Sequence, residues 1–546
     1  MSTTQHDDDR LHRYLSARAQ SISLPVADSS GIVVRATRRR HRRRTLSGVA
    51  ALAVLATGGA LLATQRPEGN PVEAIGAAAP GVVDSTLEWT VVEPDIGLGF
   101  SRSTTTTGDG ALYSLSTAPG PADYTDSSTD MRARLYRSDD GAEWSEIDLP
   151  DDLWASSLAS DDGRLYALGT APAGGARRVV VRSTDDGGGS WSDQAVVSPE
   201  LDDLQARFPG QLTLEPRFAT GADGLLATVV VRAVPDLNAL VPGFAASGGV
   251  NLTSTGVDVL AVPPGCEPTG SGGMACLSET EVVPPSTPSP VGPDGGDERR
   301  QEVIASYSWQ ELGLDPTLRT HLGGRMYTFL STDGRLFEPV GLTVGAADVA
   351  FAWPVVADDG IYRVFVTSVS PPAGGEATPT TTALRSIDGR TWERDSFGEA
   401  EGYLLSVGTL DGRPAVVLDQ NEGRRLWMTA LDGTWAAIDP RTAVPPGSEV
   451  APWVVNQAFG PLGFAAVVMT DDPNDPGRAV GAYVVHSSDG VNLSVIPVDE
   501  YLDDAERLSV AGVEVTADFI TVRLDDGDDD PATPPRQRLL VGTPRD

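Results

Sequence analysis

The sequence of 546 residues contains no lysine, two cysteines and five histidines, and these scarcities exclude several classes of protein. Two cysteines are too few for a disulfide-rich scaffold or a four-cysteine zinc site. All 41 basic residues are arginines, and 76 acidic residues give a formal net charge of −35. Because this charge repels phosphates, we expect no nucleic-acid partner. Glycine (59 residues) and proline (41 residues) are abundant instead, which is typical of a turn-rich globular protein.

Residues 45–65, TLSGVAALAVLATGGALLATQ, form a long uncharged segment between Arg44 and Arg66. A helix of this length covers the hydrocarbon layer of a bilayer, about 30 Å thick. The cluster RRRHRRR at 38–44 favours a cytoplasmic N-terminus. We therefore expect the lipid bilayer of the cell membrane as a partner. The expected organisation is a basic cytoplasmic tail (1–44), a single transmembrane helix (45–65), a linker (66–85) and an extracellular region (86–546).

A cleaved twin-arginine export signal is the alternative interpretation of the same segment. The paired arginines before a mildly apolar stretch, RRTLSGVAALAVL, favour it. The 44 residues that precede the stretch and the lack of an A-x-A cleavage site oppose it. Both interpretations place the bulk of the chain outside the cytoplasm.

Short similar strings recur along residues 86–546. They are SDDGAEW from Ser138, TDDGGGSW from Thr184, STDGRLF from Ser331, SIDGRTW from Ser386, ALDGTW from Ala430 and SSDGVNL from Ser487. A run rich in β-forming residues precedes each string, and a short apolar segment follows. The repeated unit is therefore a strand, a tight turn that contains Asp-Gly (a D–G turn), and a second strand.

These strings resemble the Asp-box, S-x-D-x-G-x-T-W, a turn signature of sialidase-like β-propellers. The string at Thr184 matches in full, whereas those at Ser138, Ser331 and Ser386 are one residue shorter between the aspartate and the aromatic residue. The resemblance implies a structural role: the aspartate accepts backbone N–H bonds, the glycine takes a positive φ, and the aromatic residue packs between sheets. The residues at the motif positions are Ser138, Asp140, Gly141, Trp144, Thr184, Asp186, Gly188, Trp191, Ser331, Asp333, Gly334, Phe337, Ser386, Asp388, Gly389, Trp392, Asp432, Gly433, Trp435, Ser487, Asp489 and Gly490.

The spacing of these strings predicts an all-β fold, a β-propeller of seven four-stranded blades, with six or eight blades as alternatives. One long interval, from Asp186 to Asp333, indicates a blade with an insert at about 234–322. The strand expected at 86–93 has no partner upstream, so we expect it to close the last blade. Loops between the second and third strands then lie on the face opposite the D–G turns, where ligands of propellers usually bind.

Two sets of residues are candidates for further chemistry. Cys266 and Cys276 lie in the Pro/Gly-rich insert, and outside the membrane they predict a disulfide, with two free thiols as the alternative. Two acidic runs offer oxygen ligands for Ca²⁺, the one cofactor that the sequence suggests. Neither run matches an EF-hand loop, so solvated acidic loops are the alternative. The runs contain Asp525, Asp526, Asp528, Asp529 and Asp530 in one case, and Asp471, Asp472 and Asp475 in the other.

The predicted function is a non-catalytic binding module for an extracellular glycan, protein or other envelope component. A sialidase-like glycoside hydrolase is one alternative, although the F/Y-R-I-P string of that family is missing and Pro216 to Phe218 (PRF) is a faint echo of it. No catalytic residue can be assigned. Of the histidines beyond the tail, His486 adjoins a D–G turn and His321 ends the insert. A transmembrane regulator that signals through residues 1–44 is a further alternative.

Overall fold

The structure is a computed structural model of the 546-residue chain. It describes residues 81–95, 98, 100–107, 110–117, 133–161, 163–173, 176–196, 198–221, 224–241, 250–252, 256–260, 266–268, 274–276, 303–334, 336–342, 349–370, 378–420, 423–429, 435–444, 452–472, 475–502, 508–526 and 536–545. The predicted tail (1–44) and transmembrane helix (45–65) lie outside these ranges. Within them, no helix has the length and apolar character that crossing a membrane requires.

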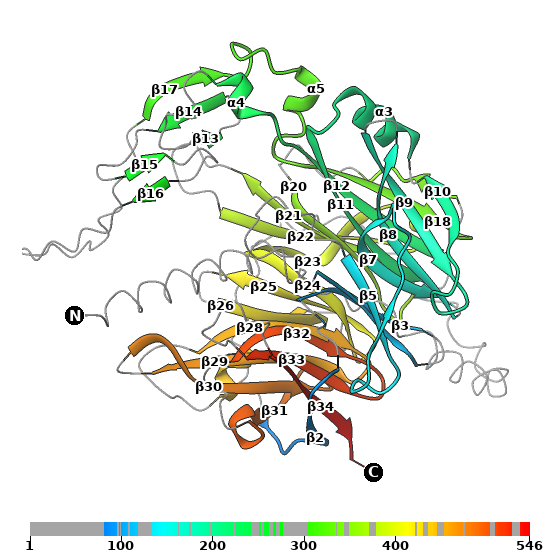
Figure 1. The fold of residues 1–546 in the computed structure, drawn as a ribbon, viewed down its shortest axis with the longest axis vertical. Coiled ribbons are helices and arrows are strands. Elements are labelled where there is room, and N and C mark those ends of the chain that lie inside the picture. The colour runs from blue at the N-terminus through cyan, green and yellow to red at the C-terminus, as the bar shows by residue number, and fades with distance from the viewer. Residues whose placement is uncertain are drawn as a thin grey trace, which may run out of the picture. The chain divides into compact units, whose positions relative to one another are not determined.

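The described chain divides into two compact units. The larger unit runs to residue 206 and also contains residues 214–230 and those from 326 onward; the smaller contains residues 207–213 and 231–325. The larger unit consists of antiparallel sheets that follow one another along the chain (Figure 1).

Six sheets of the larger unit have four strands each. They contain β3 (Phe100–Thr106), β4 (Leu112–Thr117), β5 (Ala133–Ser138) and β6 (Ser145–Ile147); β7 (Trp154–Asp161), β8 (Arg164–Ala173), β9 (Ala176–Thr184) and β10 (Ser192–Val196); β11 (Leu212–Gly221), β12 (Gly224–Ala233), β18 (Arg325–Ser331) and β19 (Glu338–Pro339); β20 (Val349–Val356), β21 (Tyr362–Ser370), β22 (Thr378–Ser386) and β23 (Glu393–Glu401); β24 (Tyr403–Leu410), β25 (Arg413–Gln420), β26 (Gly423–Thr429) and β27 (Trp435–Ile438); and β32 (Leu508–Val515), β33 (Ile520–Asp526), β34 (Arg536–Pro544) and β2 (Leu87–Val92).

A further sheet has five strands: β28 (Trp453–Gly460), β29 (Gly463–Asp472), β30 (Asp475–Ser487), β31 (Asn492–Pro497) and β1 (Gly81–Val82). The prediction of an all-β propeller is confirmed, but the number of four-stranded blades is six rather than seven. The reason is β1, which lies in the predicted linker and adds to β31 in parallel, with Gly81 opposite Asn492.

Helices are few and short in the described part of the chain. They are α3 (Pro199–Arg207), α4 (Leu237–Leu240), α5 (Pro316–Arg319), η2 (Pro440–Ala443) and η3 (Val498–Glu500). The smaller unit contains a three-stranded sheet of β13 (Val250–Leu252), β14 (Gly256–Leu260) and β17 (Val303–Ser308), and a hairpin of β15 (Cys266–Pro268) and β16 (Met274–Cys276). This unit leaves the propeller between β12 and β18, the second and third strands of one sheet.

Both ends of the described chain meet in one sheet of the propeller. Strand β2 pairs with β34 along its whole length, from Leu87 opposite Pro544 to Val92 opposite Leu539 (Figure 1). The expectation that this N-terminal strand closes the last blade is confirmed. The closure protects the edge of β34, which would otherwise present unpaired backbone groups.

The D–G turns join the third and fourth strands of the sheets and satisfy their own polar groups. In the first of them, Asp140 Oδ1 accepts the backbone N–H groups of Ala142 at 2.9 Å and Glu143 at 2.8 Å. The hydroxyl of Ser138 accepts the N–H of Gly141 at 2.8 Å. The aspartates of the turns at Asp186, Asp333, Asp388 and Asp489 also accept backbone N–H bonds. Asp432 and Gly433 lie outside the described residues.

The glycine of a D–G turn is where one sheet approaches the sheet before it. Gly141 has a φ of +79°, and a Cβ built on it would lie 2.5 Å from the ring of Phe519 in the preceding sheet. Trp144 of the same turn packs against Phe519 too, so both residues seal the junction. The same approach recurs at Gly188 against Ile147, Gly334 against Tyr166 and Gly389 against Leu330.

We expect Gly141→Ala to lower the free energy of unfolding by about 3 kcal/mol, the sum of a strained positive φ and an overpacked junction. Gly163→Ala is the matched control, because Gly163 has a φ of +84° but open space where the Cβ would lie. It should cost only the backbone strain, about 1–2 kcal/mol. Denaturant unfolding of both variants measures the difference, and equal losses would contradict the packing argument.

Candidate functional site

A pocket of about 480 Å³ lies where β5, β6, β7, β8, β9 and β11 approach one another. Its volume is within the range of small-ligand sites. We name it the Trp154 pocket. Its lining comprises Ala133, Arg134, Leu135, Glu146, Ile147, Asp148, Leu149, Pro150, Asp151, Leu153, Trp154, Ala155, Ser156, Thr170, Arg177, Leu214 and Pro216.

The Trp154 pocket takes most of its lining from the edge of the sheets opposite the D–G turns, although its residue Ile147 packs against Gly188 of a D–G turn. In an antiparallel four-stranded sheet, the starts of the first and third strands and the ends of the second and fourth share one edge. The pocket takes its residues from the starts of β5, β7, β9 and β11, the ends of β6 and β8, and the connection after β6. The D–G turns follow the ends of the third strands and therefore occupy the other edge.

Trp154 and Arg177 form the most structured part of the pocket wall. Trp154, the first residue of β7, is 38% exposed, and the guanidinium of Arg177 lies over its indole ring. Arg177 also donates from Nη1 to Thr170 Oγ1 at 3.3 Å. An arginine stacked on tryptophan is held in one orientation, because the planar guanidinium is attracted to the electron-rich ring.

Helix α3 positions the backbone of Arg177 through a hydrogen bond from outside the pocket lining. The side chain of Gln205 is 4% exposed, and its Oε1 accepts the backbone N–H of Arg177 at 3.3 Å. The sequence favours a helix here: Ser198 caps it by accepting the N–H of Leu201, Pro199 begins it, and acidic residues occupy its first turn. The Trp154 pocket is therefore supported by groups outside its lining.

The charges of the pocket are mixed, with two arginines and three carboxylates in the lining. Arg134 and Glu146 form a loose ion pair at 3.7 Å in which both side chains are about half exposed. Asp148 and Asp151 lie in the connection between β6 and β7. The indole N–H of Trp191, a motif residue, donates to the carbonyl oxygen of Asp148 at 2.9 Å and so steadies this connection.

Trp154 was not among the expected site residues, but a pattern in the sequence contains it. The first strands of four sheets begin with an aromatic residue: Phe100 in β3, Trp154 in β7, Tyr403 in β24 and Trp453 in β28. The register of each strand shifts one or two residues later, as in a β-bulge. Trp154 and Tyr403 are among the most exposed aromatic side chains that the structure describes, at 38% and 40%.

None of the candidate disulfide and calcium residues lines the Trp154 pocket. Cys266 and Cys276 are directly opposite each other in the β15–β16 hairpin, a register that suits a cross-strand disulfide. The disulfide stays a prediction. Asp525 and Asp526 end β33, whereas Asp528, Asp529 and Asp530 lie outside the described residues. The described residues contain no cluster of His, Cys, Asp and Glu suited to a metal, and calcium binding stays a prediction.

The two described histidines, His321 and His486, are structural. His321 is 2% exposed and its Nδ1 lies 2.8 Å from the carbonyl oxygen of Thr317. His486 is 5% exposed and its Nε2 lies 2.8 Å from the carbonyl oxygen of Leu462. Burial lowers the pKa of both imidazoles. Neither lines the Trp154 pocket.

Arg217, from the string that faintly echoes the sialidase motif, is buried in the junction between two sheets. It is 5% exposed, donates to the carbonyl oxygen of Ser156 at 3.2 Å and lies over the ring of Trp353. These contacts involve the protein itself, so Arg217 does not present its guanidinium to a ligand in this conformation.

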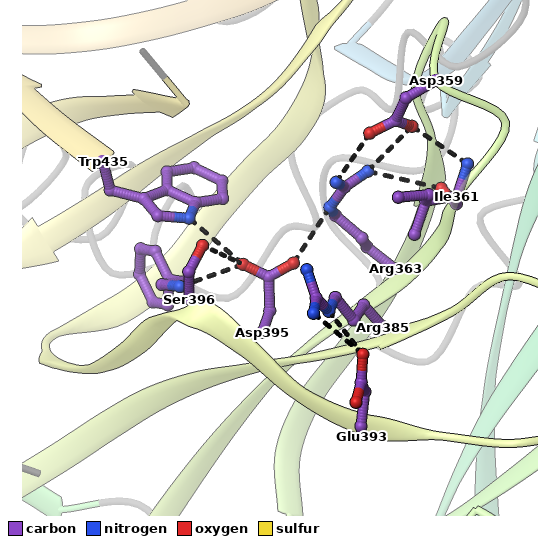
Figure 2. A network of polar contacts seen from close by, with 9 residues as sticks. Asp359, Ile361, Arg363, Arg385, Glu393, Asp395, Ser396 and Trp435 are labelled. Carbon is purple, nitrogen blue, oxygen red and sulfur yellow. Dashed lines mark hydrogen bonds and ion pairs between the residues drawn. The ribbon is translucent and has the colours of Figure 1, made fainter. Parts of the chain in front are cut away.

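A second polar cluster, at the junction of the β20–β23 and β24–β27 sheets, stabilises the fold. Figure 2 shows Asp395 between Arg363, which donates to it at 3.1 Å, and Trp435, whose indole N–H donates to it at 3.2 Å. Asp359 pairs with the other side of Arg363 at 2.8 Å. Burial alone would lower the pKa of Arg363, but both carboxylates outweigh burial and raise it. Trp435, a motif residue, thus links two sheets.

The chain matches no protein-family model and no curated protein sequence. Among solved structures, it is similar to an α-L-arabinofuranosidase of Fusarium graminearum in complex with an iminosugar inhibitor, with 12% identity, 78% of this chain and 98% of that chain covered, and a TM-score of 0.35. It is also similar to a Penicillium chrysogenum α-L-arabinanase complexed with arabinobiose (11% identity, 83% and 97% covered, TM-score 0.33). It is also similar to a Hadza microbial sialidase, with 11% identity, 76% of this chain and 74% of that chain covered, and a TM-score of 0.35.

Identities of 11–12% and TM-scores of 0.33–0.35 do not indicate a function. The propeller assignment rests on the strand order of the sheets, and any functional assignment rests on the site itself.

We expect Asp395→Ala to lower the free energy of unfolding by about 3 kcal/mol, because the buried guanidinium of Arg363 then keeps Asp359 as a partner but loses Asp395. Glu399→Ala is the matched control: Glu399 pairs with Arg394 in the same strand, but both side chains are more than half exposed. It should cost less than about 1 kcal/mol. Chemical denaturation measures both. Similar losses of unfolding free energy in the two variants would mean that the buried network stabilises the fold no more than an exposed ion pair does.

Proposed function

We propose that the protein is a non-catalytic binding module, presented outside the cell on a membrane anchor, that binds its ligand in the Trp154 pocket. The observation that carries this proposal is the wall formed by Trp154 and Arg177. Thr170 and Gln205 hold this wall in place, and it lies on the edge away from the D–G turns. A pre-formed wall avoids the entropy cost of ordering side chains when a ligand binds.

The chemistry of the lining favours a glycan among the expected ligands. Carboxylates and guanidinium groups both form strong hydrogen bonds with hydroxyl groups. The indole of Trp154 offers an apolar, polarisable surface to the C–H face of a sugar ring. The hydroxyl groups of an uncharged glycan can donate hydrogen bonds to the carboxylates and accept them from the arginines of the lining. A peptide or another envelope component is the alternative ligand.

The anchor at 45–65 and the cytoplasmic tail at 1–44 complete the proposal. Their support is the uncharged segment and the arginine cluster in the sequence. Signalling through the tail is the alternative role that these segments permit, and it requires an uncleaved anchor and a cytoplasmic partner.

A sialidase-like glycoside hydrolase is the second candidate, because the D–G strings resemble the Asp-box of sialidase-like propellers. It needs arginines that face a substrate carboxylate, and Arg217 is committed to contacts inside the protein. An assay of residues 81–546 with fluorogenic glycosides, including a sialoside, separates the candidates. Turnover above a heat-denatured control would favour the hydrolase over the binding module.

We expect Trp154→Ala to weaken glycan binding at least tenfold, about 1.4 kcal/mol, because it removes the stacking surface and the support of Arg177. The probes are neutral oligosaccharides of glucose, mannose, galactose and arabinose and peptidoglycan fragments, screened on an array and titrated by calorimetry. Tyr403→Ala, which removes a similarly exposed aromatic residue outside the pocket lining, is the control. Unchanged affinity in Trp154→Ala, or an equal loss in both variants, would contradict binding in the Trp154 pocket.

A further inference from the structure

The chain enters the propeller at the edge that carries the D–G turns. Strand β1 pairs in parallel with the start of β31, with Gly81 opposite Asn492 and Val82 opposite Leu493. The N–H of Val83 continues the pairing by donating to Leu493 at 3.0 Å. Asn492 directly follows the D–G turn of Asp489, which accepts its backbone N–H at 2.8 Å. Whatever precedes residue 81 therefore leaves the propeller from this edge.

The same edge carries the most exposed large apolar side chains of the described residues. They are Ile387 (79% exposed), Leu336 (62%) and Val491 (59%), and all three belong to D–G turns. The turns of Ile387 and Leu336 are neighbours, because Arg390 of one forms an ion pair with Glu338 beside the other at 2.6 Å. Val491 adjoins the point where β1 meets β31. A single exposed apolar residue is ordinary, but three at the tips of one edge indicate a contact surface.

The sequence between the proposed anchor and β1 is short. Residues 66–80 can span at most about 50 Å when fully extended. As a flexible chain they cover about 22 Å on average. A strand such as β8, with 10 residues, is about 33 Å long. Because the average reach of the tether is less than the length of the strands, the edge to which it is attached stays closer to the bilayer than the opposite edge does.

We infer that the face formed by the D–G turns rests on the outer surface of the membrane and that the Trp154 pocket faces away from it. The inference rests on the proposed anchor at 45–65. Ile387, Leu336 and Val491 contact the headgroup region, where short apolar side chains gain by leaving water. Hydrogen bonds from Thr391, Arg390 and Ser386 hold the pKa of Asp388 well below its usual range, so this carboxylate stays ionised at the surface of the turn.

The orientation determines which ligands reach the Trp154 pocket. A pocket turned away from the bilayer is open to soluble molecules and to polymers outside the membrane. A pocket turned towards it would be restricted to lipid headgroups and their attached glycans. The inference therefore favours a soluble or polymeric glycan as the ligand.

The test uses the full chain in phosphatidylcholine vesicles with an energy-transfer acceptor on the lipid headgroups. A donor dye is attached at Asp139→Cys or at Asp151→Cys, in a Cys266→Ser, Cys276→Ser background. Asp139 lies in the D–G turn that joins β5 and β6, and Asp151 lies in the connection after β6, so the two sites mark opposite edges of one sheet. We expect transfer from position 139 to exceed that from position 151 about twofold or more, because β5, the six-residue strand that ends at the D–G turn, spans about 20 Å between the two edges.

Two controls separate the inference from the proposed anchor. Insertion of 20 Gly/Ser residues after position 75 should reduce the difference between the two sites, because a longer tether frees the propeller to turn. Equal or reversed transfer in a chain that floats with vesicles would overturn the orientation and leave the anchor intact. That outcome would point to a protein partner on the D–G face. A chain that fails to float with vesicles would overturn the anchor and the orientation together.

Discussion

The close approach of four D–G turns, at Gly141, Gly188, Gly334 and Gly389, to the sheet before them is the contact on which the propeller depends. A four-stranded sheet buries too little apolar surface to be stable alone, so it must pack against a neighbour on each face. At Gly141 the backbone lies so near Phe519 that no side chain fits between them, and Trp144 fills the space beside the glycine. The turn thus fixes the distance between two sheets while its aspartate satisfies the backbone it exposes.

The sheet that joins the two ends of the chain adds a charged contact to this pattern. Arg523 and Glu514 are both fully buried and form an ion pair at 2.7 Å. Arg523 also donates to the hydroxyls of Ser114 and Ser116, on β4 of the neighbouring sheet. A buried ion pair adds little net stability compared with apolar packing, but a mismatched neighbour would leave the buried Arg523 without the hydroxyl groups of Ser114 and Ser116. Arg523 therefore favours one partner for the closing sheet over any other.

Much of the fold was predictable because its signals are local, whereas the site was not. Each D–G turn is encoded in about seven consecutive residues. Strand β2 has the alternation of apolar and polar residues typical of a strand, and the sequence upstream offers no recognisable partner strand. Strand β1 contributes two residues, Gly81 and Val82, which carry no pattern of their own and pair only because β31 has a free edge. The Trp154 pocket gathers residues from Ala133 to Pro216, and their proximity depends on how three sheets pack. The aromatic residues that begin β3, β7, β24 and β28 were the available signal.

The separation of structural and binding edges follows from the chemistry of the D–G turns. Their aspartates accept backbone N–H groups, and their glycines and tryptophans face the neighbouring sheet, so these residues serve the fold rather than a ligand. Among the described residues, the opposite edge carries no such repeated turn. Its connections differ from sheet to sheet, and one of them gives rise to the smaller unit between β12 and β18. Variation is tolerated there because the contacts between sheets do not depend on it, and a pocket such as that of Trp154 can form without weakening the ring.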